Sequence, residues 1–166
     1  MADDSFLNLS LELGAALQKR GWSLALAESC TGGWASEVVT MSKGSSSHFE
    51  RGFVTYSNVA KTEMLGVSET TLDQCGAVSE ETAREMAAGA LQHSRAQVTA
   101  AITGIAGPDG GTAAKPVGTV CFAWASSDGV LNSTTRHFDG DREAVRYQSV
   151  KTALEGVLQL TLTTDL

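Results

Sequence analysis

The chain has 166 residues, of which 42% are hydrophobic and 19% charged, the length and composition of one globular domain rather than a disordered or fibrous protein. A net charge of −7 argues against a nucleic-acid partner, because affinity for phosphate backbones comes largely from lysine and arginine. The acidic N-terminus and the lack of an apolar run of about 20 residues predict a cytoplasmic protein without a secretory signal or membrane span. We therefore expect a single domain over residues 1–166 that acts on a small molecule.

The first third of the chain predicts a helix, a strand and a second helix. The segment 23–27 is short and apolar on both faces, as in a strand covered on two sides. The chain then turns through residues 31–33 into a helix containing Trp34, Val38 and Met41. Ahead of the strand, Gly21 ends a helix whose apolar residues recur at helical spacing: Phe6, Leu9, Leu13, Ala16 and Leu17.

The middle of the chain predicts two strands and two helices. A strand is expected at 52–56, followed by a short helix over 59–65 with Asn58 as its N-cap. Ser79 is expected to cap a further helix. The segment 97–103 then predicts a buried strand, which leads into a glycine-rich loop at 104–111.

The last third predicts an antiparallel pair of strands and a helix. The segment 117–125 is apolar on both faces and suits a central strand, whereas the polar segment 130–138 suits an edge. Asp141 is expected to cap a final helix with the apolar stripe Tyr147, Val150, Leu154, Val157 and Leu158. These elements predict an α/β fold, a three-layer α/β/α single domain with a mixed, mostly parallel sheet.

Ser29 is the first candidate for chemistry. It lies at the end of a predicted buried strand and just before a helix, where open α/β sheets bind their ligands. Gly32 and Gly33 let the backbone approach a ligand closely, and free N–H groups at the helix start can stabilise an anion. A helix cap and a tight turn explain the same residues equally well.

A serine nucleophile needs a base, and Lys61 is the stronger candidate. In the first turn of its predicted helix, the helix dipole and burial would both lower its pKa, although most lysines are simply solvated. His48 is the one credible histidine, because His93 and His137 fall on predicted surface elements. Tyr56 could relay a proton or contact the substrate, but the sequence alone favours a half-buried strand tyrosine.

The remaining features indicate an anion site and no metal. Successive N–H groups in the 104–111 loop can form a nest for an anion, although the loop matches neither a P-loop nor GxGxxG. Arg142 could clamp a phosphate or could be a solvated charge. The histidines lack metal-binding spacing and the three cysteines form no CxxC pair, so we expect neither a metal nor another cofactor.

Five segments occur in the order seen in one known family. From about Leu9 to Leu158 the chain resembles the CinA C-terminal domain family, which includes stand-alone nicotinamide-nucleotide amidases. The resemblance implies hydrolysis of nicotinamide mononucleotide to nicotinic acid mononucleotide and ammonia, a salvage step for pyridine nucleotides, and a possible homodimer. The segments are AESCTGG at 27–33, GFVTYSN at 52–58 with Lys61, GAVS at 76–79, TGIAGPDGG at 103–111 and KPVGTV at 115–120.

Carried over by position, the resemblance implies Ser29 as nucleophile, Lys61 as base and Tyr56 as a supporting group. Arg142 is implied to contact the phosphate or another part of the substrate. The implied lining of the nucleotide pocket is Thr31, Gly32, Gly33, Thr103, Gly104 and Gly107. Two alternatives stay open: Cys30 as nucleophile with His48 as base, and a catalytically silent nucleotide-binding or regulatory module.

Overall fold

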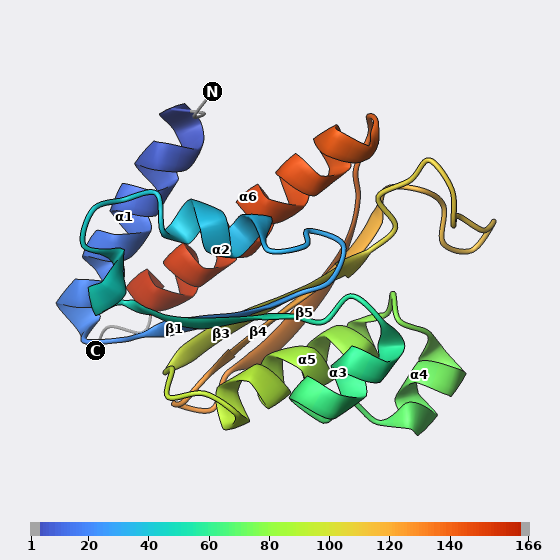
Figure 1. Cartoon of the computed structure of the whole chain (residues 1–166), viewed down its shortest axis with the longest axis horizontal. Helices are drawn as coiled ribbons and strands as arrows, with labels where there is room; N and C mark the ends of the chain where they lie inside the picture. The colour runs from blue at the N-terminus through green and yellow to red at the C-terminus, as the bar shows by residue number, and fades with distance from the viewer. Residues whose placement is uncertain (1–3, 164–166) are drawn as a thin grey trace.

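A computed structural model describes residues 4–163 and places one sheet between two layers of helices (Figure 1). The strands are β1 (Leu24–Glu28), β2 (Phe49–Val54), β3 (Val98–Gly104), β4 (Thr119–Ser126) and β5 (Leu131–His137). The helices are α1 (Asp4–Arg20), α2 (Trp34–Val39), α3 (Asn58–Leu65), α4 (Glu69–Cys75), α5 (Glu80–Gln92) and α6 (Arg142–Thr163), with a 3₁₀ turn, η1, at Ser45–Ser47.

The sheet has the strand order β2-β1-β3-β4-β5. The β2–β1 and β1–β3 pairs are parallel, and the β3–β4 and β4–β5 pairs are antiparallel. Four strands therefore run one way and β4 runs against them, which confirms the predicted mixed sheet. Strand β4 lies inside the sheet and the polar β5 at its edge, as predicted. The chain leaves β1 for β2 on one side and reaches β3 on the other, so β1 ends at the point where the strand order reverses.

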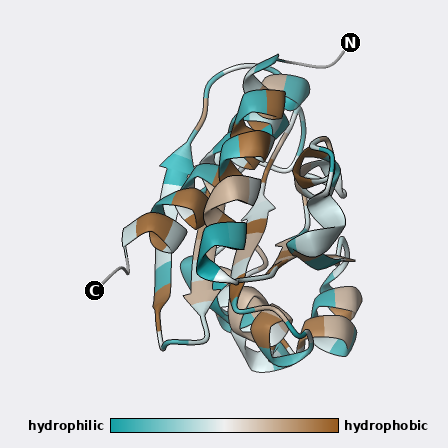
Figure 2. Ribbon diagram, turned by 90° about the vertical axis from the view of Figure 1, so that its left-hand side faces the viewer, coloured by the Kyte–Doolittle hydropathy of each residue, from teal (hydrophilic) through white to brown (hydrophobic). Residues whose placement is uncertain are grey.

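Two separate cores fill the space between the sheet and its helices. Helices α1, α2 and α6 cover one face, and α3, α4 and α5 cover the other, as Figure 1 shows. The first core includes Phe122, Leu26 and Ile102, and the second includes Met86, Ala101 and Leu65. Figure 2 shows hydrophobic and hydrophilic residues on the same helices, as expected for helices with one buried face. The three-layer α/β/α prediction is thus confirmed.

Several local predictions were wrong, mostly where polar residues end an element. The N-cap of α3 is Ser57, whose hydroxyl accepts from the Ala60 N–H at 3.0 Å, and Asn58 already belongs to the helix. Strand β2 starts and ends earlier than predicted, because an edge strand can carry the exposed Arg51 without an apolar pattern. Met41 lies beyond α2, and the sequence pattern missed α4 and η1.

The described helices contain no membrane span. No helix within residues 4–163 is both long enough and apolar enough to cross a bilayer.

Candidate active site

Ser29 follows directly on β1, the strand at which the sheet order reverses. Its N–H donates to the Ile102 carbonyl of β3 at 3.0 Å, while on the other side the Thr55 N–H donates to the Glu28 carbonyl at 2.8 Å. The end of β1 is thus hydrogen-bonded on one side to β3 and on the other to the segment that follows β2, and the chain leaves the sheet immediately after Ser29. Ser29 is only 8% exposed, so its hydroxyl is held in a defined, nearly dry position.

Lys61 contacts Ser29 directly. The chain runs from β2 through Thr55 and Tyr56 into α3, and this helix directs Lys61 back toward the end of β1. Its Nζ donates to the Ser29 Oγ at 3.0 Å, to the Thr55 carbonyl at 3.1 Å and to the Tyr56 carbonyl at 3.2 Å. Lys61 is 1% exposed, which the sequence alone could not establish.

The surroundings of Lys61 suit a lysine that gains and loses a proton. Burial lowers the pKa of Lys61 from its ordinary value, so the neutral amine is easier to reach than in a solvated lysine. An ammonium has three N–H donors, which the three oxygens can accept. A neutral amine can keep its two N–H bonds to the carbonyls and accept the Ser29 hydroxyl proton on its lone pair. Both protonation states are therefore satisfied without any rearrangement of the backbone.

Glu28 is a buried charge to which the sequence analysis gave no role. Its side chain is fully buried at the end of β1 and accepts five hydrogen bonds from the following turn. Oε1 accepts from the Thr31 hydroxyl and from the N–H groups of Gly33 and Ala35 at 2.7–3.1 Å. Oε2 accepts from the Ser36 N–H and hydroxyl at 2.9 and 2.7 Å. The carboxylate thus satisfies the N-terminus of α2 and fixes the turn that carries Ser29. A lone carboxylate at the end of an apolar strand, six residues before the first residue of α2, was the available signal in the sequence.

The turn after Ser29 contains two backbone N–H groups that donate to no oxygen of the described residues, and the first of them, that of Cys30, lies against its own thiol. The Gly32 N–H donates to the Ser29 carbonyl at 3.0 Å, and the Trp34 N–H donates to the Thr31 carbonyl at 3.0 Å. No oxygen of residues 4–163 accepts from the N–H groups of Cys30 and Thr31. These two groups are the available donors for an oxyanion beside Ser29.

Arg146 was also missed by the sequence analysis. From α6, its Nε donates to the Cys30 carbonyl and its Nη2 to the Thr31 carbonyl, each at 3.1 Å. Its position four residues after Arg142 on the same helix was the only signal in the sequence.

Tyr56, Gly107 and Arg142 form one bridge beside the serine. Arg142 lies at the start of α6 and donates to the Gly107 carbonyl at 2.8 Å and to the Tyr56 hydroxyl at 3.1 Å. The Tyr56 side chain is 59% exposed, and its contact with Lys61 is made by the backbone carbonyl. The bridge joins the β2–α3 connection, the glycine-rich loop and α6.

The other residues implied for the pocket differ in their exposure. Gly32 is exposed and Gly33 is half-buried, whereas Thr31 is fully buried against Glu28. Thr103 is buried, and its hydroxyl donates to the Ala77 carbonyl at 2.7 Å. A Cβ at position 104 would lie 2.7 Å from the Val120 side chain, so packing alone requires Gly104.

Cys30 and His48 do not form a pair. His48 lies at the other end of β1, where its carbonyl accepts from the Leu24 N–H at 2.8 Å. The strand between them spans roughly 13 Å at about 3.3 Å per residue. Burial raises the pKa of the Cys30 thiol to about 11, so Cys30 stays protonated near neutral pH. The geometry therefore contradicts the alternative of a Cys30 nucleophile with His48 as its base.

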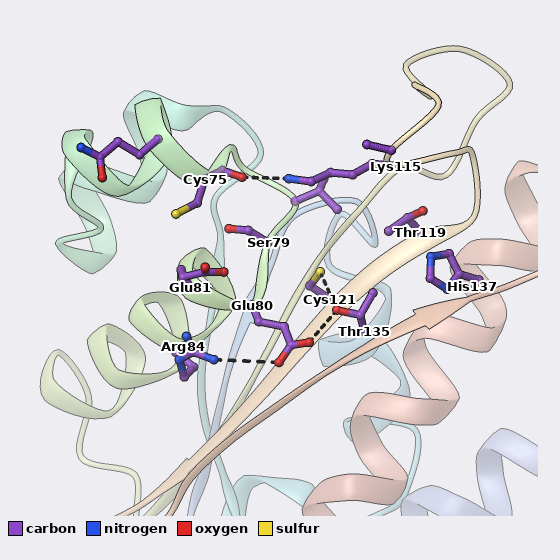
Figure 3. Close-up of a pocket in the computed structure, with 13 residues that line it drawn as sticks. Cys75, Ser79, Glu80, Glu81, Arg84, Lys115, Thr119, Cys121, Thr135 and His137 are labelled. Carbon is purple, nitrogen blue, oxygen red and sulfur yellow. Dashed lines mark hydrogen bonds and ion pairs between the residues drawn. The ribbon is translucent and has the colours of Figure 1, made fainter.

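A hollow of about 670 Å³ lies on the α5 face, between α5, β4 and β5 (Figure 3). Its charged groups hold neighbouring segments: Lys115 donates to the Cys75 carbonyl at 2.8 Å, and Glu80 accepts from Ser133 and Thr135. It contains none of the residues predicted for catalysis or substrate binding. The Ser29–Lys61 pair is chemically the better candidate, because a nucleophile and a base are already in contact there. Within residues 4–163 there is also no group of three or more His, Cys, Asp or Glu side chains placed to hold a metal ion.

Comparison with known proteins gives a consistent result over almost the whole chain. The family model of the CinA C-terminal domain matches residues 7–161. The nicotinamide-nucleotide amidohydrolase PncC of Escherichia coli (strain K12) is 53% identical over 159 residues, which cover 96% of both chains. The protein of the same name from Enterobacter agglomerans is 52% identical, over 96% of this chain and 97% of its own.

Solved structures share the fold. The competence/damage inducible protein CihA from Agrobacterium tumefaciens has a TM-score of 0.93 and 43% identity, over 96% of this chain and 98% of its own. A competence-damaged protein (CinA) superfamily protein from Escherichia coli has a TM-score of 0.90 and 40% identity, over 96% of this chain and 93% of its own.

Proposed function

This chain belongs to the CinA C-terminal domain family, and from that premise we propose that it is an amidohydrolase that converts nicotinamide mononucleotide into nicotinic acid mononucleotide and ammonia. Two relatives above 50% identity are named nicotinamide-nucleotide amidohydrolases and match over nearly their whole length. The observation that carries the chemistry is the 3.0 Å contact between the Lys61 Nζ and the Ser29 Oγ, both nearly buried.

The reaction proceeds through two acyl-transfer steps. Neutral Lys61 takes the proton of the Ser29 hydroxyl as the Oγ attacks the carboxamide carbon, and the carbonyl oxygen becomes an oxyanion. Lys61 then returns the proton to the departing nitrogen, which leaves as ammonia and gives an ester on Ser29. In the second step a water loses one proton to Lys61 and attacks the ester, and Ser29 recovers its hydrogen from Lys61 as the carboxylic acid is released and loses its remaining proton to solvent. No redox partner is needed.

The remaining residues support this role in different ways. The N–H groups of Cys30 and Thr31 are the proposed oxyanion donors. The Tyr56 carbonyl helps to hold Lys61, while the Tyr56 hydroxyl and Arg142 stand beside the site and are proposed to contact the nucleotide. Thr103, Gly104 and Gly107 shape the neighbouring loop. We propose that these residues line the nucleotide pocket together with Thr31, Gly32 and Gly33.

Single substitutions of Ser29 and Cys30 test the choice of nucleophile. Ser29→Ala should lower ammonia release from nicotinamide mononucleotide by at least about 10³-fold. Cys30→Ala should keep most of the activity, because the thiol is buried and protonated. Retained activity in the Ser29 variant would overturn the proposal. Ligand-induced thermal stabilisation of the unaltered protein without any ammonia release would favour the silent binding module.

Three further parts of the proposal concern the setting of the reaction. We place the enzyme in pyridine-nucleotide salvage because its product is a pyridine nucleotide with a free carboxylate. Cytoplasmic location and a homodimer stay predictions from the sequence and the family resemblance. Cell fractionation and light scattering of the purified protein test them.

A further inference from the structure

We propose that Arg146 is a positioning residue that aims the oxyanion donors, and this inference rests on the proposed serine chemistry. The contacts that carry it are its two hydrogen bonds to successive peptide carbonyls, those of Cys30 and Thr31, at 3.1 Å each. A guanidinium is a planar fork with fixed donor directions, so one side chain can hold two carbonyls in a set relation.

The direction of these carbonyls fixes the direction of the Thr31 N–H. A trans peptide is planar, so its N–H and C=O groups point in opposite directions. The Cys30 carbonyl and the Thr31 N–H belong to the same peptide. When Arg146 draws that carbonyl toward α6, the Thr31 N–H must point away from α6.

The layers of the fold show where that N–H then points. Helix α6 covers one face of the sheet, and α3, which carries Lys61, covers the other (Figure 1). A donor that points away from α6 therefore points toward the side on which Lys61 contacts the Ser29 Oγ. The proposed oxyanion forms on that side, because the carbonyl under attack lies against the Oγ.

Glu28 and Arg146 act on the same turn from different directions. Glu28 binds the N–H groups of residues 33, 35 and 36, beyond the turn, and Arg146 binds the carbonyls of residues 30 and 31 within it. The carbonyls of Ser29 and Thr31 are further held by the Gly32 and Trp34 N–H groups. The Cys30 carbonyl has Arg146 as its only side-chain or backbone donor within residues 4–163. Loss of Arg146 therefore frees this peptide in particular.

Arg146 also packs against Trp34 of α2, and the test must separate this structural contact from positioning. Its guanidinium carbon lies 5.4 Å from the centre of the Trp34 ring, a cation–π contact that could support α2. Arg146→Met keeps an unbranched, apolar stem against Trp34 and removes both hydrogen bonds. Arg146→Lys keeps the charge but not the fork. Lys151→Ala, at an exposed position of the same helix, is the matched control.

The first experiment measures ammonia release from nicotinamide mononucleotide. Removal of a whole oxyanion donor costs roughly 10²–10³-fold in kcat, so a donor that is present but free to turn should cost roughly 10–100-fold. We expect this loss in Arg146→Met with KM changed by less than about threefold, since the donor acts on the transition state. Arg146→Lys should be intermediate, and the pH midpoint of activity should not move, because Lys61 keeps its surroundings. A kcat equal to that of Lys151→Ala, or a loss found wholly in KM, would overturn the proposal.

The second experiment does not depend on the natural substrate. An alkyl fluorophosphonate is attacked at phosphorus by the Ser29 Oγ: the Oγ–P bond forms, fluoride leaves and Lys61 accepts the proton. The phosphoryl oxygen then needs the same donors, so Arg146→Met should label about 10–100-fold more slowly but to the same final extent. A lower final extent at an unchanged rate would mean that Arg146 only supports folding, and would overturn the proposal.

The two readouts together separate the two proposals. If the unaltered protein labels at Ser29 but releases no ammonia, the proposed substrate fails, and slower labelling of Arg146→Met still supports positioning. If ammonia is released and Arg146→Met matches the control in both assays, positioning fails and the proposed function stands. A protein that neither labels nor releases ammonia would overturn both.

Discussion

Two buried basic groups lie at opposite ends of β1, and they differ in what surrounds them. Lys61, at the carboxyl end, contacts three oxygens and is satisfied in both protonation states. His48, at the amino end, is 3% exposed, and its Nε2 is the one buried side-chain nitrogen or oxygen within residues 4–163 without a hydrogen-bond partner. Burial lowers the pKa of both groups. Burial alone therefore does not identify a catalytic base. What distinguishes Lys61 is that its Nζ has hydrogen-bond acceptors and directly contacts the nucleophile, the Ser29 Oγ.

The packing around His48 explains its position without chemistry. A Cβ at position 14 of α1 would lie 2.7 Å from the His48 ring, so the ring fills the space that Gly14 leaves open. Such a group favours its neutral form, since a protonated ring would be a buried charge with an unmatched donor. His48 is thus expected to affect stability, and Lys61 to affect catalysis.

The largest expected effect comes from removing the base. Lys61→Met replaces the amine with an apolar side chain of similar length, and kcat for ammonia release should fall by roughly 10²–10⁴-fold because no group remains to take the serine proton. In the unaltered protein, kcat/KM should rise with pH as Lys61 loses its proton, with a midpoint below the ordinary 10.5.

The matched control for this substitution is Lys115→Met, which removes the lysine of the hollow in Figure 3. It should leave kcat within about twofold, since the Lys115 Nζ donates to the Cys75 carbonyl and makes no hydrogen bond to Ser29 or Lys61. A larger loss in the control than in Lys61→Met would move the active site to that hollow.

A second test concerns the buried acid at the same end of β1. Glu28→Gln places an amide NH₂ against either the three donors now bound to Oε1 or the two bound to Oε2. The free energy of unfolding should fall by about 2–4 kcal/mol, because hydrogen bonds to a charged group contribute roughly 1.5–3 kcal/mol each and some survive. Urea denaturation measures this change.

Glu37→Gln, at an exposed position in the first turn of α2, is the control for Glu28 and should change stability by less than about 0.5 kcal/mol. Equal stability losses in the two variants would mean that the five hydrogen bonds of Glu28 do not hold the turn.

The smallest expected effect lies at the other end of the strand. The pKa of His48 is lowered by burial, so the folded protein binds fewer protons than the unfolded chain once the pH approaches the ordinary value of 6.5. Stability should therefore fall as the pH drops through about 6.5, with a slope from this group of at most about 1.4 kcal/mol per pH unit. His48→Gln should reduce that slope, and urea denaturation between pH 7.5 and 5.5 compares the two proteins.

The exposed Asn132 gives the matched variant, Asn132→Gln, which changes no ionisable group and should keep the slope of the unaltered protein. Identical slopes in all three proteins would show that His48 does not account for the loss of stability in acid.

The sequence by itself determined the order of layers and the place of the candidate serine. Apolar runs, alternating polar strands and helical stripes identify the sheet and its covering helices, since each depends on residues near one another in the chain. The same local logic put Ser29 at a strand-to-helix turn and Lys61 in a first helical turn. It failed at Ser57, at α4 and at the ends of β2, where short polar segments carry no periodic signal.

Only the tertiary structure decided which of these groups meet. The contact of Lys61 with Ser29 joins residues 32 positions apart, and the contacts of Arg146 join α6 to a turn more than 110 positions earlier. No local pattern encodes such distances, because they follow from how the strands order themselves and which face each helix covers. The same packing separated Cys30 from His48 and buried Lys61.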